Sequence, residues 1–243
     1  MPRPRLLSAA LALAASSLLI SGCAMNATPT VTPVPLPSTE TPGGGDSEVH
    51  AAWLDDGSAV GILTFGSSSC LPTVSAADVV DGVLTVELTD PDGVACTRDL
   101  VARGSYVPLP EGVDPSEDLD VVVTGSFSGQ AEIAGDPDLA GKGGGLAEGA
   151  PSAGWADDAV FLLLTWGSST CPPLISSAVA STPTEVTVTV DPLPADQVCT
   201  ADFGPRVSVV AVDGLGDDED ERVEAVLAGD EFDALRIPIA GHR

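Results

Sequence analysis

An internal duplication with a period of about 100 residues constrains the fold of this chain more than any other feature. Landmark residues recur in one order: Trp53, Cys70, Cys96, Arg103 and Gly125 in the first copy, and Trp155, Cys171, Cys199, Arg206 and Gly229 in the second. Such an order is hard to obtain by chance. The chain therefore contains two related units that must satisfy the same packing pattern.

Each copy has the sequence pattern of β-structure. Residues 84–88 and 186–190 alternate apolar and polar side chains, which is typical of a half-buried strand. Residues 160–166 form a continuous apolar run of strand length, and Asp81-Gly82 is a hairpin signal. Short strands between frequent Gly and Pro residues predict an all-β fold of two tandem, duplicated small β-sandwich or barrel-like domains.

The N-terminus has the pattern of an export signal. Arg3 and Arg5 precede the apolar run 6–20, which is shorter than the roughly 20 residues of a membrane-spanning helix. Leu19-Ile20-Ser21-Gly22-Cys23 then resembles the lipobox of bacterial lipoproteins. This resemblance implies cleavage before Cys23, a diacylglyceryl group on its sulfur, and a lipid-anchored location on the extracytoplasmic face of the cell membrane. The alternative is an ordinary secretory signal with an incidental cysteine.

The cysteine count fits an exported protein. Setting Cys23 aside leaves four of the five cysteines, which permit three disulfide pairings. The duplication favours pairing within each copy, Cys70 with Cys96 and Cys171 with Cys199. Each bond would close a loop of about 27 residues and contribute roughly 3–4 kcal/mol in the chain-entropy model. Zinc ligation is the competing interpretation, but the sequence has no C-x-x-C pair and only two histidines.

Composition divides the chain into segments. The residues that follow Cys23 are rich in Pro and Thr and lack apolar periodicity, which predicts a disordered tether. The predicted organisation is a signal peptide (1–22), the lipidated cysteine and tether (23–49), a first β domain (50–135), a Gly-rich linker (136–153) and a second β domain (154–243).

The chain is strongly acidic, with 36 acidic and 9 basic residues and a formal net charge of −27. Such a surface repels the phosphates of nucleic acids, which argues against nucleic acid binding. It would favour solubility, cations or basic partners. Abundant Ala, Val, Gly and Asp with a single Lys also resembles lipoproteins of high-GC Gram-positive bacteria, and this resemblance implies no activity.

Serine-rich turns precede Cys70 and Cys171 and follow predicted strands, as a nucleophile elbow would. They lack the closing Gly of G-x-S-x-G, and a serine nucleophile needs a base, usually His or Lys. His50, Lys142 and His242 have no counterpart in the other copy. The pattern favours turns whose hydroxyls bond backbone groups and present the disulfide cysteines.

Two repeated acidic pairs, Asp55-Asp56 and Asp157-Asp158, are candidate calcium ligands because carboxylate oxygens bind this ion. The run Asp213–Glu221 is a third candidate. None of them has the alternating Asp spacing of an EF-hand loop, so solvated turns are the simpler interpretation. A glycosidase-like carboxylate pair stays open, because nothing singles out one pair among so many acids.

Arg103 and Arg206 recur in both copies, four residues after Asp99 and Asp202 respectively. One interpretation is an ion pair with a repeated acid such as that aspartate, which would make the arginine structural. The other is a site for an anionic ligand. The repeated tryptophans likewise fit either a core position or a stacking platform for sugars.

These features predict a membrane-anchored extracytoplasmic lipoprotein that is a non-catalytic binding or interaction module of the cell envelope. Its partners would be the membrane, through the lipid, and a cell-wall component or envelope protein, and no cofactor is expected. The alternative is a carboxylate- or calcium-dependent envelope hydrolase. The absence of a repeated His or Lys base argues against nucleophilic hydrolases but leaves carboxylate enzymes open.

Overall fold

The computed structural model describes residues 48–140, 149–216 and 221–243. These residues form an all-β fold with two disulfide bonds, Cys70–Cys96 and Cys171–Cys199, as predicted. Cys23, Lys142 and nearly all of the predicted tether lie outside the described residues. Across the described ranges, no helix is long and apolar enough to cross a membrane.

The described part of the first copy forms two sheets. Its elements are β1 (His50–Leu54), η1 (Asp55–Gly57), β2 (Ala59–Gly66), β3 (Thr73–Val80), β4 (Val83–Thr89), β5 (Val101–Pro108), β6 (Leu119–Gly125), β7 (Gly129–Ile133) and η2 (Pro137–Leu139). One sheet has the order β1-β2-β5 and the other β3-β4-β6-β7. The predicted hairpin at Asp81-Gly82 is confirmed between β3 and β4. Apolar alternation explains β4, whose residues Leu84, Val86 and Leu88 are buried.

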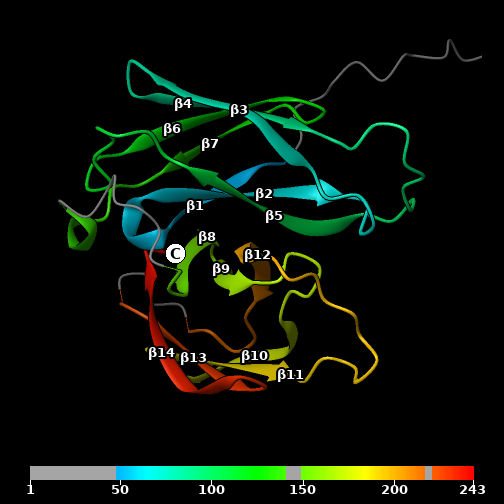
Figure 1. The fold of residues 1–243 in the computed structure, drawn as a ribbon. Coiled ribbons are helices and arrows are strands. Elements are labelled where there is room, and N and C mark those ends of the chain that lie inside the picture. Colours follow the sequence, from blue (N-terminus) through cyan, green and yellow to red (C-terminus); the bar gives the residue numbers. More distant parts are fainter. Residues whose placement is uncertain (1–47, 141–148, 217–220) are drawn as a thin grey trace, which may run out of the picture. The chain divides into compact units, whose positions relative to one another are not determined.

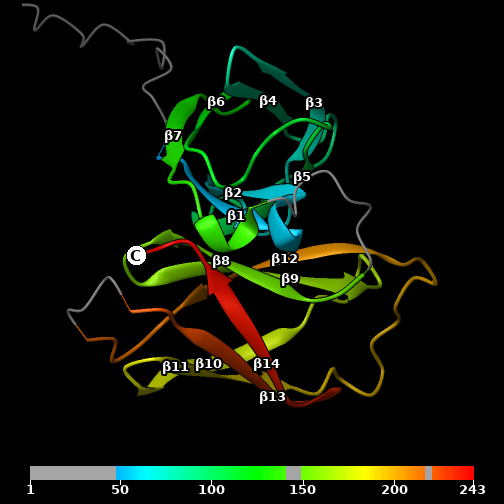
Figure 2. The same cartoon turned by 90° about the vertical axis from the view of Figure 1, so that its left-hand side faces the viewer.

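The strands of the second copy that the structure describes belong to one seven-stranded sheet. They are β8 (Ser152–Asp157), β9 (Val160–Gly167), β10 (Leu174–Thr182), β11 (Glu185–Asp191), β12 (Gly204–Ala211), β13 (Glu224–Gly229) and β14 (Phe232–Ala240). The order is β10-β11-β13-β14-β8-β9-β12. The sheet folds over on itself because β14 pairs with both β13 and β8 (Figure 2).

Four layers of strands succeed one another through the two copies (Figure 1). The first core lies between the two sheets of the first copy and contains Trp53. The second lies inside the folded sheet of the second copy and contains Trp155. Both repeated tryptophans are therefore core residues.

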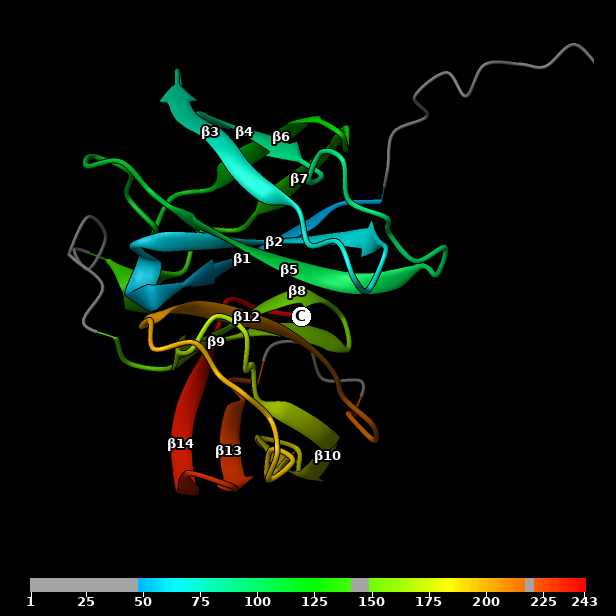
Figure 3. The same cartoon turned by 45° about the vertical axis from the view of Figure 1, so that its right-hand side comes forward.

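A third core joins the two copies. Its buried members come from β1, β2 and β9: Ala52, Leu54, Ala59, Leu63, Leu162 and Leu164. Strands β2 and β5 lie across β9 and β12 (Figure 3). The backbones approach so closely that a Cβ on Gly154 would lie 2.1 Å from the carbonyl oxygen of Trp53. The copies are thus stacked layers with a shared core and do not stand as two separate sandwiches.

Candidate binding site between the two copies

The repeated arginines hold the turns that carry the disulfides. Arg103 on β5 is only 3% exposed, and its Nη1 donates to the carbonyl oxygen of Cys70 at 2.6 Å. Arg206 on β12 donates in the same way to the carbonyl oxygens of Cys171 at 2.7 Å and Trp166 at 2.9 Å. Carbonyl groups that lose water need other donors, so both arginines have a structural role.

The acids close to these arginines are not Asp99 and Asp202, the examples that the sequence suggested. Among the described residues, Arg103 instead lies 3.8 Å from an oxygen of Asp90. Arg206 lies 3.7 Å from an oxygen of Glu231. Both distances are long for a charge-assisted hydrogen bond, so the carbonyl contacts are the stronger interactions.

The two aspartates brace the disulfide loops instead. Hydrogen bonds from Ser68 and Thr97 lower the pKa of Asp99. Hydrogen bonds from Thr200 and Ser169 lower the pKa of Asp202 to about 2 in the same way.

The serine-rich turns are hydrogen-bonded loops, as predicted. The Ser67 hydroxyl lies 2.8 Å from that of Thr97, and the Thr97 backbone N–H donates to the Ser69 hydroxyl at 3.0 Å. His50, which the nucleophile interpretation would need nearby, lies beside Glu48 at 3.2 Å.

The turn after β1 has an unusual backbone. Asp55, Asp56 and Gly57 have φ values of 54°, 52° and 81°. Residues other than glycine seldom occupy this left-handed region, and in folded proteins such strain gathers at functional sites. The backbone N–H of Asp55 donates to the Ser152 hydroxyl on β8 at 2.7 Å, and its carboxylate accepts from Tyr106 at 3.1 Å. Both copies therefore hold this turn.

The surroundings of Asp55 alter its acidity. Burial raises the pKa of Asp55, and the nearby charge of Asp56 adds to the rise, although the hydrogen bond from Tyr106 opposes it. Burial and the Asp55 charge also raise the pKa of Tyr106, so its hydroxyl stays protonated as the donor. Asp55 consequently loses its charge at a higher pH than an exposed aspartate does.

Asp136, which the sequence places in the linker, joins the two copies. It is 1% exposed, and its two carboxylate oxygens accept from Arg222 at 2.8 and 2.9 Å. The backbone N–H of Gly241 also donates to it at 2.9 Å. Burial opposes ionisation of Asp136, but these hydrogen bonds outweigh it and lower the pKa to about 2. Asp136, Arg222 and Gly241 form a unit that we call the Asp136 latch.

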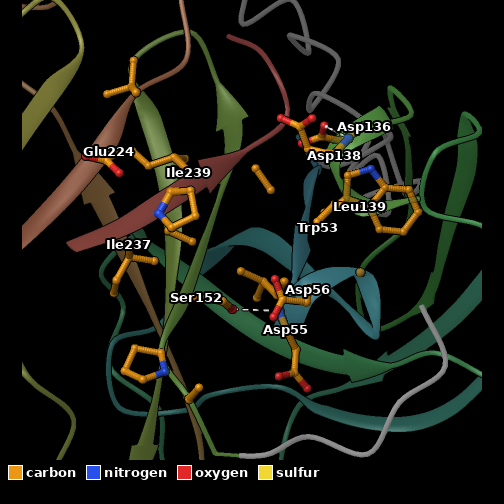
Figure 4. Close-up of a pocket in the computed structure, with 18 of the residues that line it drawn as sticks. Trp53, Asp55, Asp56, Asp136, Asp138, Leu139, Ser152, Glu224, Ile237 and Ile239 are labelled. Atoms are coloured by element: carbon orange, nitrogen blue, oxygen red, sulfur yellow. Dashed lines mark hydrogen bonds between the residues drawn. The ribbon is translucent and has the colours of Figure 1, made fainter. Parts of the chain in front are cut away.

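The turn and the latch surround a pocket of about 430 Å³ between the copies. Figure 4 shows Asp136 and Asp138 at one side of the pocket, Asp55 and Asp56 at another, and Ile237 facing them from β14. The charged residues that line it are Asp55, Asp56, Asp136, Asp138, Glu224, Arg222 and Arg236. Among the described residues, the wall therefore has five acidic and two basic side chains on an otherwise largely apolar surface.

Both arginines of the pocket are bound to carboxylates of this chain. Arg222 binds Asp136 and also lies 3.3 Å from Asp138. Arg236 donates to Glu224 at 3.0 Å and to Glu185 at 2.7 Å. Arg222 and Arg236 are therefore engaged by Asp136, Asp138 and Glu224.

The equivalent acidic pair of the second copy lies elsewhere. Asp157 accepts a hydrogen bond from the backbone N–H of Asp158 at 3.0 Å, and both residues line a smaller cavity beside His242. In the described ranges, no group of three His, Cys, Asp or Glu residues is placed to hold a metal ion. The third calcium candidate, 213–221, is described only in part.

Sequence reasoning missed the latch and assigned no role to Tyr106. Asp136 and Arg222 are far apart in the chain, and no sequence spacing announces their contact. A signal did exist for the left-handed turn, because Asp56-Gly57 is a turn dipeptide and one more residue separates the landmark tryptophan from the next strand in the first copy.

Comparisons of this chain with protein-family models, with curated proteins and with solved structures found no match. The chemistry of the pocket is therefore the basis on which a function can be proposed.

Proposed function

We propose that this chain is a membrane-anchored extracytoplasmic lipoprotein that binds, without catalysis, a ligand of the cell envelope in the pocket between its copies. The observation that supports this most is the pocket itself, which both copies build and which an acidic, left-handed turn borders. Its size is in the range of small-molecule sites. The ligand class that fits is an organic cation that has a positively charged group and an apolar part.

The charges of the wall support a cationic ligand. The arginines are occupied by carboxylates, so an anionic ligand would have to displace an ion pair. A cation can instead approach the carboxylate of Asp55, while its apolar part contacts Leu139 and Ile237. Strain at the two aspartates is consistent with a turn kept for binding and not for stability.

The same contacts favour binding over hydrolysis. A carboxylate hydrolase needs one protonated and one ionised carboxyl group, and the pKa values of Asp55 and Asp136 do differ in that direction. However, both oxygens of Asp136 are engaged by Arg222. Asp136 is thus poorly placed to attack a substrate or to activate water.

A matched pair of small probes tests the pocket. We expect the full-length protein in detergent to bind phenethylammonium saturably in calorimetry, and phenethyl alcohol at least about tenfold more weakly, because only the former carries a charge. The Asp55→Asn/Asp56→Asn variant should lose this preference. Asp157→Asn/Asp158→Asn, the equivalent change in the other copy, is the control and should keep it. Equal binding of both probes, or no saturable binding, would contradict the proposal.

The pH dependence gives a second measurement on the same pocket. Cation binding needs ionised carboxylates, so affinity should fall as the pH is lowered. Because the pKa of Asp55 is raised by burial, the midpoint of this loss should lie above the range of an exposed aspartate. A midpoint within the ordinary aspartate range would show that Asp55 is not the carboxylate that binds the cation.

The anchor requires a separate experiment. Cys23→Ala should either leave the signal peptide uncleaved or release the protein to the medium, because lipidation and the coupled cleavage both need the sulfur. Detergent phase partitioning of cell extracts measures this. A cleaved variant that still partitions with membranes would show that the protein is held there by another means.

A further inference from the structure

Two edge strands of the fold lie against each other where the copies meet. Strand β5 is the last in the order β1-β2-β5, and β12 is the last in the seven-stranded sheet. In the part of the chain that the structure describes, neither has a second partner strand. The two strands pack closely, since a Cβ on Gly104 of β5 would lie 2.4 Å from the side chain of Val207 on β12. Unpaired strand edges are places where another chain can add a strand.

The free edge of β5 presents a regular row of backbone groups. In an antiparallel pair, alternate residues bond to the partner strand and the residues between them point away from it. The N–H of Leu109 donates to the carbonyl oxygen of Ser58 at 2.9 Å, in the register of the β2–β5 pair. Odd-numbered residues of β5 therefore face β2. The N–H and C=O groups of Ala102, Gly104 and Tyr106 consequently point to the open side.

The free edge of β12 offers fewer groups. The N–H of Val212 donates to the carbonyl oxygen of Ala159 at 2.9 Å, so the odd-numbered residues of β12 point away from β9. One of them is Pro205, the equivalent of Ala102, and proline has no N–H to donate. Just beyond the other end of β12, Asp213 already pairs with β10. Of the two edges, that of β5 therefore has the complete row of donors and acceptors.

A groove of about 570 Å³ follows these edges. Residues 101–106 of β5 and 205–209 of β12 line it without interruption. Neighbouring residues of a strand point to opposite faces, so a cavity that all of them line runs along the backbone edge. Residues 71–74 and Pro172-Pro173 form most of the remaining wall. The groove is thus placed where a strand added to β5 would lie.

The charge of the groove limits what can occupy it. Among the described residues, none that lines it is acidic, although 36 of the chain's 243 residues are. Its charged side chains are Arg103 and Arg206, whose buried Nε atoms lack a hydrogen-bond partner in the described structure. A basic side chain would meet these two positive charges. An acidic segment, or a second copy, would be repelled by a chain of net charge −27. The occupant that fits is uncharged.

We propose that the free edge of β5 binds an extended, uncharged segment of another protein, which joins the sheet as a further strand. Ala102, Gly104 and Tyr106 exchange backbone hydrogen bonds with this segment, and its alternate side chains lie against the wall of the groove. The groove and the acidic pocket share no lining residue, so this site does not depend on the proposed ligand.

A pair of N-methylated peptides tests strand addition on the full-length protein in detergent. Both are seven-residue peptides that alternate Thr and Val, with capped ends, a fluorescent label and three N-methyl groups. In the first peptide the methyl groups occupy alternate amides and leave one backbone edge intact, whereas in the second they occupy three consecutive amides and interrupt both edges. We expect the first peptide to bind saturably and at least about tenfold more tightly in fluorescence anisotropy. Because the peptides are uncharged, salt should not change this ratio.

Ala102→Pro tests the edge itself. Proline removes the outward N–H, and the second copy already holds Pro205 at the equivalent position, so the fold accommodates the change. The variant should bind the first peptide about tenfold more weakly, with a urea midpoint close to that of the parent. Ala102→Ser keeps the N–H and is the matched control, for which unchanged binding is expected. Pro205→Ala, which gives β12 a donor, should not tighten binding.

The proposal is overturned if both peptides bind alike or if neither binds saturably, and these two measurements need no variant. It is also overturned if a folded Ala102→Pro variant binds normally. Tighter binding by Pro205→Ala would assign the segment to β12 instead of β5. A dimer in size-exclusion chromatography that Ala102→Pro dissociates would make a second copy of the chain the occupant, contrary to the proposal.

Discussion

The stretch from the landmark tryptophan to its paired residue on the next strand is one residue longer in the first copy than in the second. Trp53 pairs with Val60, whereas the equivalent Trp155 pairs with Phe161. The longer turn closes through three left-handed residues and carries its acids into the pocket between the copies. The shorter one leaves Asp157 and Asp158 away from that pocket. One residue therefore separates the turn that borders the pocket from an ordinary hairpin connection.

The copies differ in how their last strand ends. In the first copy β7 stops at Ile133, and the next carbonyl oxygen, of Ala134, accepts from the Trp53 indole at 2.9 Å. In the second copy β14 continues to Ala240 and pairs with β8. A similar pattern of strands thus yields two sheets in one copy and a single folded sheet in the other. The two copies therefore have their cores and disulfides in common, and the length of the last strand determines whether the strands form two sheets or one.

The largest expected contrast concerns the repeated arginines. The side chain of Arg103 is 2% exposed and lies under the ring of Phe127, with Cζ 4.9 Å from its centroid, whereas that of Arg206 is 8% exposed. Arg103→Ala should lower the free energy of unfolding by about 4 kcal/mol and Arg206→Ala by about 2 kcal/mol, because buried carbonyls lose their donor. Urea midpoints at unchanged slope measure this.

Arg→Lys at either position should restore only part of the loss, since lysine cannot donate to two carbonyls in a fixed geometry. If Arg206→Ala lowers the free energy of unfolding as much as Arg103→Ala does, the difference in burial between the two arginines has no effect on stability. If Arg206→Ala costs nothing, that arginine becomes a candidate ligand site.

The disulfides should instead be equivalent. Their sequence separations are 26 and 28 residues, so removing either bond by a double Cys→Ala change should cost about 3–4 kcal/mol in the chain-entropy model. Thermal unfolding of the two variants provides the comparison. If only one variant loses thermal stability, the two copies do not stabilise each other through the third core.

The Asp136 latch tests how the copies hold together. Asp136→Asn should cost about 2 kcal/mol at neutral pH, because a charge-assisted pair with Arg222 is lost. Its folded pKa of about 2 lies below the ordinary value, so the contribution is complete above about pH 4 and disappears as the pH falls through 2.

Urea midpoints of parent and variant should accordingly converge between pH 4 and pH 2. Asp138→Asn is the matched control, since Asp138 is exposed and its contact with Arg222 is longer. Parallel midpoints of parent and Asp136→Asn at every pH would refute the pKa assignment.

The smallest expected effect isolates the longer turn. Gly57 and Gly82 share a φ of 81°, but a Cβ on Gly57 would lie 2.6 Å from Pro115, while one on Gly82 would meet open space. Gly82→Ala should cost about 1 kcal/mol for the backbone conformation alone. Gly57→Ala should cost about 1 kcal/mol more, because Pro115 must move. Equal losses in thermal unfolding would mean that the turn is loosely packed.

Local patterns in the sequence were sufficient to predict several of the strands and both disulfides. Alternation in residues 84–88 and 186–190 located β4 and β11, and the duplication selected the correct cysteine pairs. The structural role of Arg103 was among the predictions, but its partner was not. Every residue has a backbone carbonyl, so the sequence does not show which carbonyl accepts from Arg103. The repeated Asp99 was therefore a natural but wrong choice of partner.

Contacts between the copies could not be predicted from the sequence. Asp136 was assigned to the linker because Gly residues follow it, although its carboxylate is buried against Arg222. The pocket depends on this contact and on the parallel pairing of β14 with β8, and neither leaves a local signal. The acids of the turn were predicted as candidates for calcium, and their place in the pocket came only from the fold.

The position of β14 has a consequence for how the chain acquires its structure. This strand is the last of the second copy in the described sequence, yet it lies in the middle of the seven-stranded sheet. A chain that emerges from its N-terminus can complete the first copy early, but β8 and β13 keep unpaired edges until residues 232–240 arrive. Exposed strand edges recruit other chains, so a molecule truncated before β14 should aggregate through its second half while its first half is already folded.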